Sequence, residues 1–119
     1  MTKEFWINLP VKDISRSKEF FSKLGFSFNT KNGNTEHSAS LLLGQKNVVV
    51  MLFDEQIFKS FTNRKVADTT QVSQVLLSID AESKEEVDEM AKKAADAGGT
   101  TNHTPGEMQG WMYGCVFTD

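Results

Sequence analysis

The sequence contains one short strand-and-helix unit twice. Residues 5–11 (FWINLPV) and 73–79 (SQVLLSI) both have the apolar character of a strand, and a polar segment typical of a helix start follows each within a few residues. Four pairs at matching positions lie about 68 residues apart: Ile7/Val75, Leu9/Leu77, Val11/Ile79 and Ser15/Ser83. A module repeated in this way predicts two related halves, with a binding site where the halves meet.

The first half, residues 1–53, predicts a module with the element order βαβββ. After the opening strand, Asp13 can cap a helix that ends at Gly25. A short strand follows the helix, and residues 38–43 and 48–53 predict two more strands. The last of these is a continuous apolar run, VVVMLF, which is typical of a strand covered on both faces.

The second half is predicted to repeat this order less completely. Residues 54–70 break the pattern and indicate a linker with a short helical turn, and residues 71–119 form the second module. Its helix starts with a capping box at residues 83–86 and ends at Gly98. Short strands are expected after that helix and over residues 110–117, with a loop starting at Pro105 and Gly106. The module lacks its last strand, βαββ instead of βαβββ, which truncation of the chain or cover by a neighbouring chain would explain.

Composition and charge exclude several classes of function. The chain has 119 residues, enough for a single structural domain of the α+β class, and a formal net charge of −3 with acids and bases interspersed. No basic field is available for phosphate backbones, so nucleic acid is excluded as a partner. No apolar stretch has the length of a membrane span or a signal peptide, and Cys115 is the single cysteine. We therefore expect a cytoplasmic protein that does not bind membranes.

The phrase LPVKDISRSKEFF at residues 9–21, the glycine at Gly25 and the element order resemble the vicinal-oxygen-chelate superfamily. This superfamily includes glyoxalase I, bleomycin and fosfomycin resistance proteins, and extradiol dioxygenases. Within it, the chain is most similar to bacterial proteins described as glyoxalase-like. The resemblance implies paired βαβββ modules that form a cup, in which a divalent metal chelates two neighbouring oxygens of a substrate. The resemblance gives almost no information about which substrate is bound.

The resemblance also implies four metal-ligand positions, and this sequence departs from most of them. The first position holds Trp6, whose indole N–H is a donor only. The second falls on the strand 48–53, where Met51 offers only a thioether. The third falls on Gln74, whose amide oxygen can coordinate, and the fourth lies beyond Asp119. We therefore expect no metal cofactor, with Gln74 alone matching a family ligand position.

A few other residues are candidates for acid, base or nucleophile chemistry. His37 beside Glu36 could face the cup as a general base, although a histidine on the solvent side of a strand is the alternative. Glu107 could pair with His103 or border a pocket, although solvated loop residues are again the alternative. Cys115 lacks a neighbouring His or Lys and is expected to be a small buried thiol.

Aromatic residues give the stronger functional signal, because they predict an amphipathic pocket for a small organic molecule. The predicted ligand-binding residues are Trp6, Phe58, Gln74, Trp111 and Tyr113, with Phe53 and Phe61 as further members of the aromatic set. The sequence thus favours a homodimeric protein that binds a small organic molecule without the family metal. A divalent-metal-dependent lyase or extradiol-type dioxygenase, with ligands from a lost C-terminus or a partner chain, is the alternative. A regulatory ferredoxin-like module is a third possibility.

Overall fold

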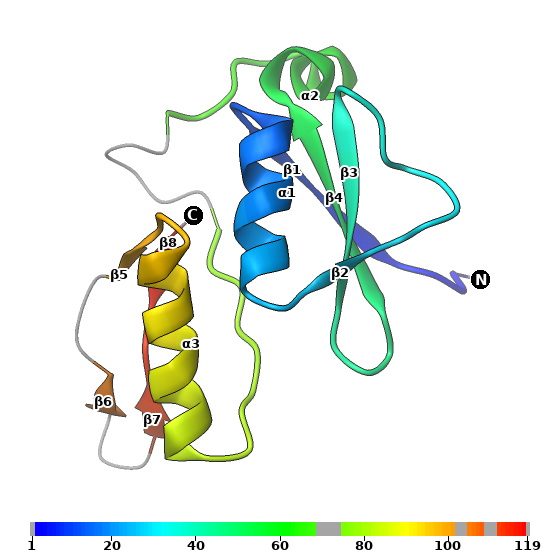
Figure 1. Cartoon of the computed structure of the whole chain (residues 1–119). Coiled ribbons are helices and arrows are strands. Elements are labelled where there is room, and N and C mark those ends of the chain that lie inside the picture. Colours follow the sequence, from blue (N-terminus) through cyan, green and yellow to red (C-terminus); the bar gives the residue numbers. More distant parts are fainter. Residues whose placement is uncertain (1, 69–74, 102–104, 109–111, 119) are drawn as a thin grey trace. The chain divides into compact units, whose positions relative to one another are not determined.

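The computed structural model describes residues 2–68, 75–101, 105–108 and 112–118 (Figure 1). The chain divides into two units: unit 1 comprises Met1–Lys18 and Phe26–Ser78, and unit 2 comprises Glu19–Gly25 and Ile79–Asp119. The elements follow in the order β1 (Trp6–Val11), α1 (Ile14–Lys23), β2 (Ser27–Phe28), β3 (Ser38–Leu43), β4 (Val48–Asp54), α2 (Glu55–Thr62), α3 (Lys84–Asp96), β5 (Thr100–Thr101), β6 (Gly106–Met108), β7 (Met112–Gly114) and β8 (Phe117–Thr118).

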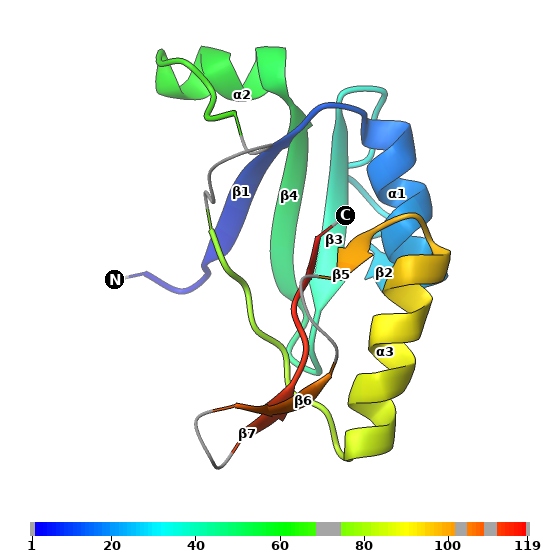
Figure 2. The same ribbon diagram turned by 90° about the vertical axis from the view of Figure 1, so that its left-hand side faces the viewer.

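Unit 1 is built on a four-stranded sheet with the order β1-β4-β3-β2. β1 pairs in parallel with β4, with Trp6 opposite Val49, whereas the β3–β4 and β2–β3 pairs are antiparallel. Figure 2 shows β1, β4 and β3 side by side, with α1 alongside the sheet. The predicted βαβββ order of the first module is confirmed.

The two faces of this sheet differ in burial because successive side chains of a strand point to opposite sides. In β4, Val50 and Leu52 are only 1% and 2% exposed, and Ile14 at the start of α1 is also buried. Val49, Met51 and Phe53 alternate with them and stay partly exposed. The expectation that residues 48–53 are covered on both faces is therefore wrong: one face forms the core of unit 1, and the other lines a pocket.

The helix α2 follows β4 directly, where the sequence predicted a linker with only a short helical turn. Asp54 is the N-cap, and its Oδ1 accepts a hydrogen bond from the backbone N–H of Ile57 at 2.9 Å. The helix ends at Asn63, which adopts a left-handed conformation with φ 54°. The rings of Phe53 and Phe61 meet edge to face with centroids 5.1 Å apart, which fixes the helix against the end of β4.

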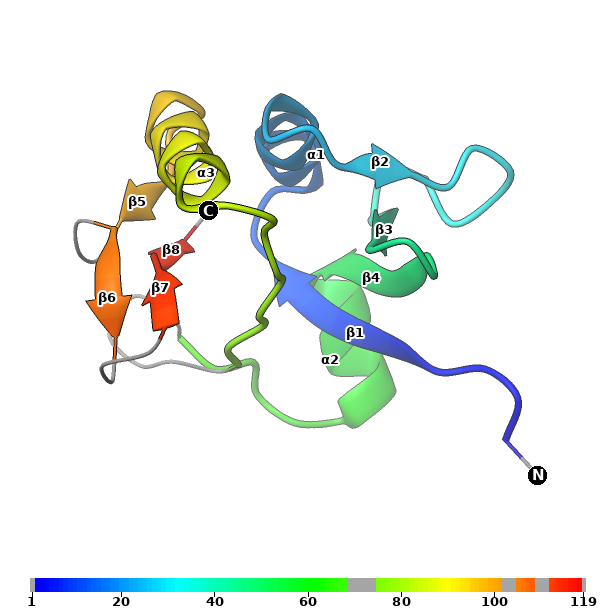
Figure 3. The ribbon, with the colours of Figure 1, turned by 90° about the horizontal axis from the view of Figure 1, so that it is seen from below.

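Unit 2 is organised around α3, where the predicted capping box is confirmed. The side chain of Ser83 accepts a hydrogen bond from the Glu86 N–H at 3.1 Å, and the Glu86 carboxylate accepts one from the Glu82 N–H at 2.9 Å. Ala94 on α3 is fully buried. In the same unit, the centroids of the Phe20 and Phe117 rings lie 6.3 Å apart. Figure 3 shows β6 and β7 side by side, and β5 pairs with β8.

Three expectations for the second half need correction. Of the strand predicted over 73–79, the described residues 75–79 form no strand, and Leu76 is 74% exposed. A strand needs a partner for its backbone hydrogen bonds: β1 has β4, but no described strand pairs with residues 75–79. The loop predicted from Pro105 instead forms β6, paired with β7, and the strand predicted over 110–117 is divided into β7 and β8 in its described part.

Candidate functional site

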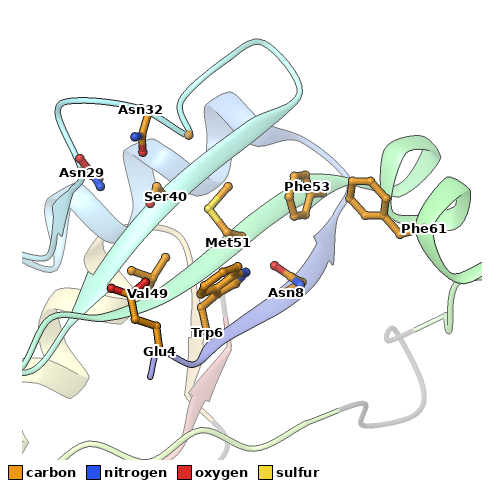
Figure 4. Close-up of a pocket in the computed structure, with 11 residues that line it drawn as sticks. Glu4, Trp6, Asn8, Asn29, Asn32, Ser40, Val49, Met51, Phe53 and Phe61 are labelled. Carbon is orange, nitrogen blue, oxygen red and sulfur yellow. The ribbon is translucent and has the colours of Figure 1, made fainter. Parts of the chain in front are cut away.

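A pocket of about 710 Å³ lies on the partly exposed face of the sheet of unit 1 (Figure 4). Its lining comes from β1, β4, the loop after β2, β3 and α2, and consists of Glu4, Trp6, Asn8, Asn29, Asn32, Gly33, Ser40, Val49, Met51, Phe53 and Phe61. A volume of this size is in the range that proteins use for drug-sized organic ligands.

The floor of the pocket follows from the register of the parallel strands. Trp6 lies opposite Val49, and Asn8 lies opposite Met51, so alternate residues of both strands share this face. Trp6 is 52% exposed although it is a large aromatic residue. Figure 4 shows Glu4 and Val49 toward one side of the pocket, the Trp6 ring near its middle below Met51, and the Phe53 and Phe61 rings at the other side.

One wall of the pocket is the loop that joins β2 to β3, and hydrogen bonds tie this loop to β3. The Asn34 side chain accepts from the Ser40 N–H at 3.0 Å and donates to the Asn29 carbonyl. The Ser38 hydroxyl donates to the Gly33 carbonyl at 2.9 Å. The loop is therefore held on the sheet by hydrogen bonds within the protein itself.

Gly33 brings that wall into close contact with the sheet. Its φ is +84°, a conformation that favours glycine, and a Cβ atom at this position would lie 2.9 Å from the Cβ of Ser40 and 3.5 Å from the Cε of Met51. A glycine is therefore required here by both the backbone and the available space.

Electrostatically, the described lining is neutral except at one point. Glu4 is the charged residue in it, and the other polar members are the amides Asn8, Asn29 and Asn32 and the hydroxyl of Ser40. No lysine, arginine or histidine is among the described lining residues.

Trp6 and Met51, the two first-module positions where the family resemblance implies metal ligands, both line this pocket. Their donor atoms do not fit a hard divalent cation, since an indole N–H cannot coordinate and a thioether is a soft ligand. Among the described residues, no group of three or more His, Cys, Asp or Glu side chains could hold a metal ion. Gln74, the third family position, lies outside the described residues.

His37, the candidate general base, is not among the residues that line the pocket. Its Nδ1 lies 2.5 Å from Oδ2 of Asp54, and the two side chains are 62% and 23% exposed. The pKa of Asp54 is lowered, first by the hydrogen bond from the Ile57 N–H and also by the bond to His37. The pair therefore joins the start of β3 to the N-cap of α2.

The predicted ligand-binding residue Phe58 lies half-buried on α2 and is also absent from the pocket lining. Tyr113, on β7 in unit 2, donates its hydroxyl to Oδ1 of Asp88 on α3 at 2.5 Å, and the Nζ of Lys84 lies 5.3 Å from the ring centroid. The hydrogen bond to Asp88 is the main reason that the pKa of Tyr113 is raised. Its hydroxyl is thus engaged with a helix of its own unit.

The other predicted residues fall in or beside β6 and β7. The backbone of Glu107 in β6 pairs opposite Tyr113, while His103 and Trp111 lie outside the described residues. Cys115 was expected to be a small buried thiol but is only partly buried; its thiol donates to the Val87 carbonyl at 3.9 Å, and burial raises its pKa.

Sequence reasoning missed most of the polar half of the site. Asn8 could have been found from the alternation Trp6, Asn8 along one strand face, a pattern that the printed sequence carries. Asn29, Asn32 and Gly33 lie in a loop, where no periodicity shows which side chains turn toward the sheet.

Comparisons with known proteins agree with this architecture. The family described as "Bleomycin resistance protein-like N-terminal" matches residues 4–35, which include the start of the pocket lining. None of the curated proteins matches the chain.

Three solved structures are similar to the chain as a whole. A hypothetical protein from S. aureus is 30% identical, with a TM-score of 0.86, over 100% of this chain and 87% of that one. A glyoxalase/bleomycin resistance protein/dioxygenase family enzyme from Burkholderia phytofirmans PsJN is 21% identical, with a TM-score of 0.75, over 96% of this chain and 87% of the other. A glyoxalase-related enzyme from Fulvimarina pelagi is 17% identical, with a TM-score of 0.69, over 88% and 71%.

Proposed function

The chain belongs to the glyoxalase/bleomycin resistance/dioxygenase group, the vicinal-oxygen-chelate superfamily, and on that premise we propose that it binds a small organic molecule in the pocket around Trp6. The proposal includes no metal cofactor. No helix in the described parts of the chain is long and apolar enough to cross a membrane.

One observation carries the proposal: the pocket is present, but the ligand positions within it hold an aromatic ring and a thioether. Trp6 and Met51 line a pocket of about 710 Å³ together with the Phe53 and Phe61 rings. Such side chains bind organic molecules by stacking and dispersion, and the neighbouring amides supply hydrogen bonds that orient the ligand. The first-module side of the site is therefore suited to binding and not to coordination.

The test is a ligand screen by tryptophan fluorescence on a Trp111→Phe variant, which leaves Trp6 as the reporting indole. We expect saturable quenching by a subset of small aromatic compounds. Trp6→Ala, studied by calorimetry, should weaken their binding about tenfold because it removes the largest stacking surface. Phe5→Ala is the matched control, since Phe5 is a neighbouring aromatic residue, 74% exposed and outside the pocket lining.

The metal-dependent alternative is tested separately by elemental analysis of the full chain after exposure to manganese, iron, nickel and zinc. A stoichiometric ion that survives dialysis and is required for ligand binding would contradict the proposal and favour the lyase or dioxygenase class. Ligand binding that is unaffected by chelators supports the proposal.

A further inference from the structure

The charge distribution around the pocket is one-sided. Glu4 is the charged residue of the described lining, and no cationic side chain lines the pocket within the described part of the chain. A ligand that carried a carboxylate or phosphate group would therefore meet no countercharge from these described lining residues and would lie beside the Glu4 carboxylate.

The aromatic surfaces of the pocket also favour a positively charged ligand. The faces of Trp6, Phe53 and Phe61 carry the negative part of the ring quadrupole, which attracts cations placed over them. A tryptophan face is the strongest of the three in this respect. Figure 4 shows Glu4 and Trp6 as neighbours in the pocket lining, so both can act on one ligand charge.

The end of the pocket near Phe61 adds a weaker negative potential, which comes from the helix α2. Phe61 belongs to the last turn of α2, where the helix dipole places partial negative charge. At the opposite end of α2, the Asp54 carboxylate caps the helix and lies at the positive end of the dipole. Lys59 also belongs to the last turn, but it is exposed and does not line the pocket.

We propose that this pocket selects flat organic cations, such as N-alkylated heteroaromatic rings, over neutral and anionic molecules of the same shape. The inference rests on the proposed function and names the class of ligand. The positive ring stacks on Trp6 and lies near Glu4, the amides of Asn8 and Asn32 can accept hydrogen bonds from ligand N–H groups, and the polarisable thioether of Met51 contacts the ring edge.

The test uses three probes on one ring system: 1-methylquinolinium as the cation, 4-methylquinoline at mildly alkaline pH as the neutral molecule, and quinoline-4-carboxylate as the anion. Isothermal titration calorimetry on the full chain gives the dissociation constants. We expect the cation to bind about three- to tenfold more tightly than the neutral probe, from its cation–π contact and the nearby carboxylate, and the anion to bind most weakly.

Two variants separate the sources of selectivity. Glu4→Gln should reduce affinity for the cation about two- to fivefold, the size of a screened charge contact, and leave the neutral probe unchanged. Glu36→Gln removes the same charge from an exposed residue of unit 1 that does not line the pocket, and it should change neither constant.

Equal binding of cation and neutral probe, or tighter binding of the anion, would overturn the inference while leaving the proposed function in place. Failure of all three probes, with other organic molecules still bound in the fluorescence screen, would also overturn the inference alone. Failure of every compound in that screen would overturn the proposed function and the inference with it.

Discussion

Replacing Gly33 by alanine tests the construction of the pocket wall most directly. The added methyl group would lie 2.9 Å from the Cβ of Ser40, 3.4 Å from its hydroxyl oxygen and 3.5 Å from the terminal carbon of Met51. The methionine end can move, but the Ser40 Cβ is attached to the backbone of β3, and Ser40 is 2% exposed. The loop therefore has to move away from the sheet.

The cost has two parts that a matched variant can separate. The left-handed conformation with φ +84° destabilises an alanine by about 1–2 kcal/mol. The steric overlap with β3 adds about 1–3 kcal/mol, the usual cost of overpacking. Gly44→Ala is the control, because Gly44 also borders β3 with φ +75° but has nothing within 4 Å of the added atom, so it pays the first cost alone.

Urea unfolding followed by circular dichroism gives the free energy of unfolding of both variants, and calorimetry with a pocket ligand gives their affinity. We expect Gly33→Ala to be less stable than Gly44→Ala by about 1–3 kcal/mol and to lose ligand affinity, while Gly44→Ala keeps it. Equal losses of stability in the two variants, with ligand affinity intact in both, would refute the close packing of this loop on the sheet.

Three further outcomes can be checked on the same protein. The pKa of Asp54 is lowered from 3.8, so its ionised form stabilises the fold above that value. This stabilisation is lost as the pH falls through the lowered pKa. Asp54→Asn, which keeps the hydrogen bond from the Ile57 N–H, should therefore flatten this part of an acid-unfolding curve. Tyr113 is the single tyrosine, so ultraviolet titration should report a midpoint above 10.0, which Asp88→Ala should move back down because it removes the carboxylate that accepts the hydrogen bond from the Tyr113 hydroxyl. Ser83→Ala should cost about 1 kcal/mol in urea unfolding and speed amide exchange in the first turn of α3, whereas Ser83→Thr should retain most of the cap.

The parts of the fold that could be predicted from sequence are those with short-range causes. The cap at Ser83 is encoded by residues within one helical turn, and the structure confirms it. The order of elements in the first module follows from alternation and turn residues, and it is also confirmed. Trp6, predicted as a ligand-binding residue, lines the pocket of unit 1, and its role in binding stays a prediction.

The parts that could not be predicted depend on residues distant in sequence. Whether residues 75–79 form a strand is decided by a pairing partner, and their apolar pattern is the same with or without one. Asn29 and Asn32 belong to a loop that the hydrogen bonds of Asn34 and Ser38 tie to β3, and no local pattern encodes these contacts between a polar loop and a strand. His37 was expected on a strand but lies just before β3, and its hydrogen bond to Asp54 joins segments that only the sheet brings together.

The parallel pairing of β1 with β4 has a consequence for the order in which binding competence arises. The β3–β4 contacts are local, since a tight turn joins these strands, whereas Trp6 and Val49 pair across the whole of α1, β2 and β3. Loop-closure entropy makes such long-range contacts slow to form. Because the pocket lining includes residues of both β1 and β4, a ligand binds only chains in which these two strands have paired. A rising ligand concentration therefore stabilises the paired state of β1 by mass action.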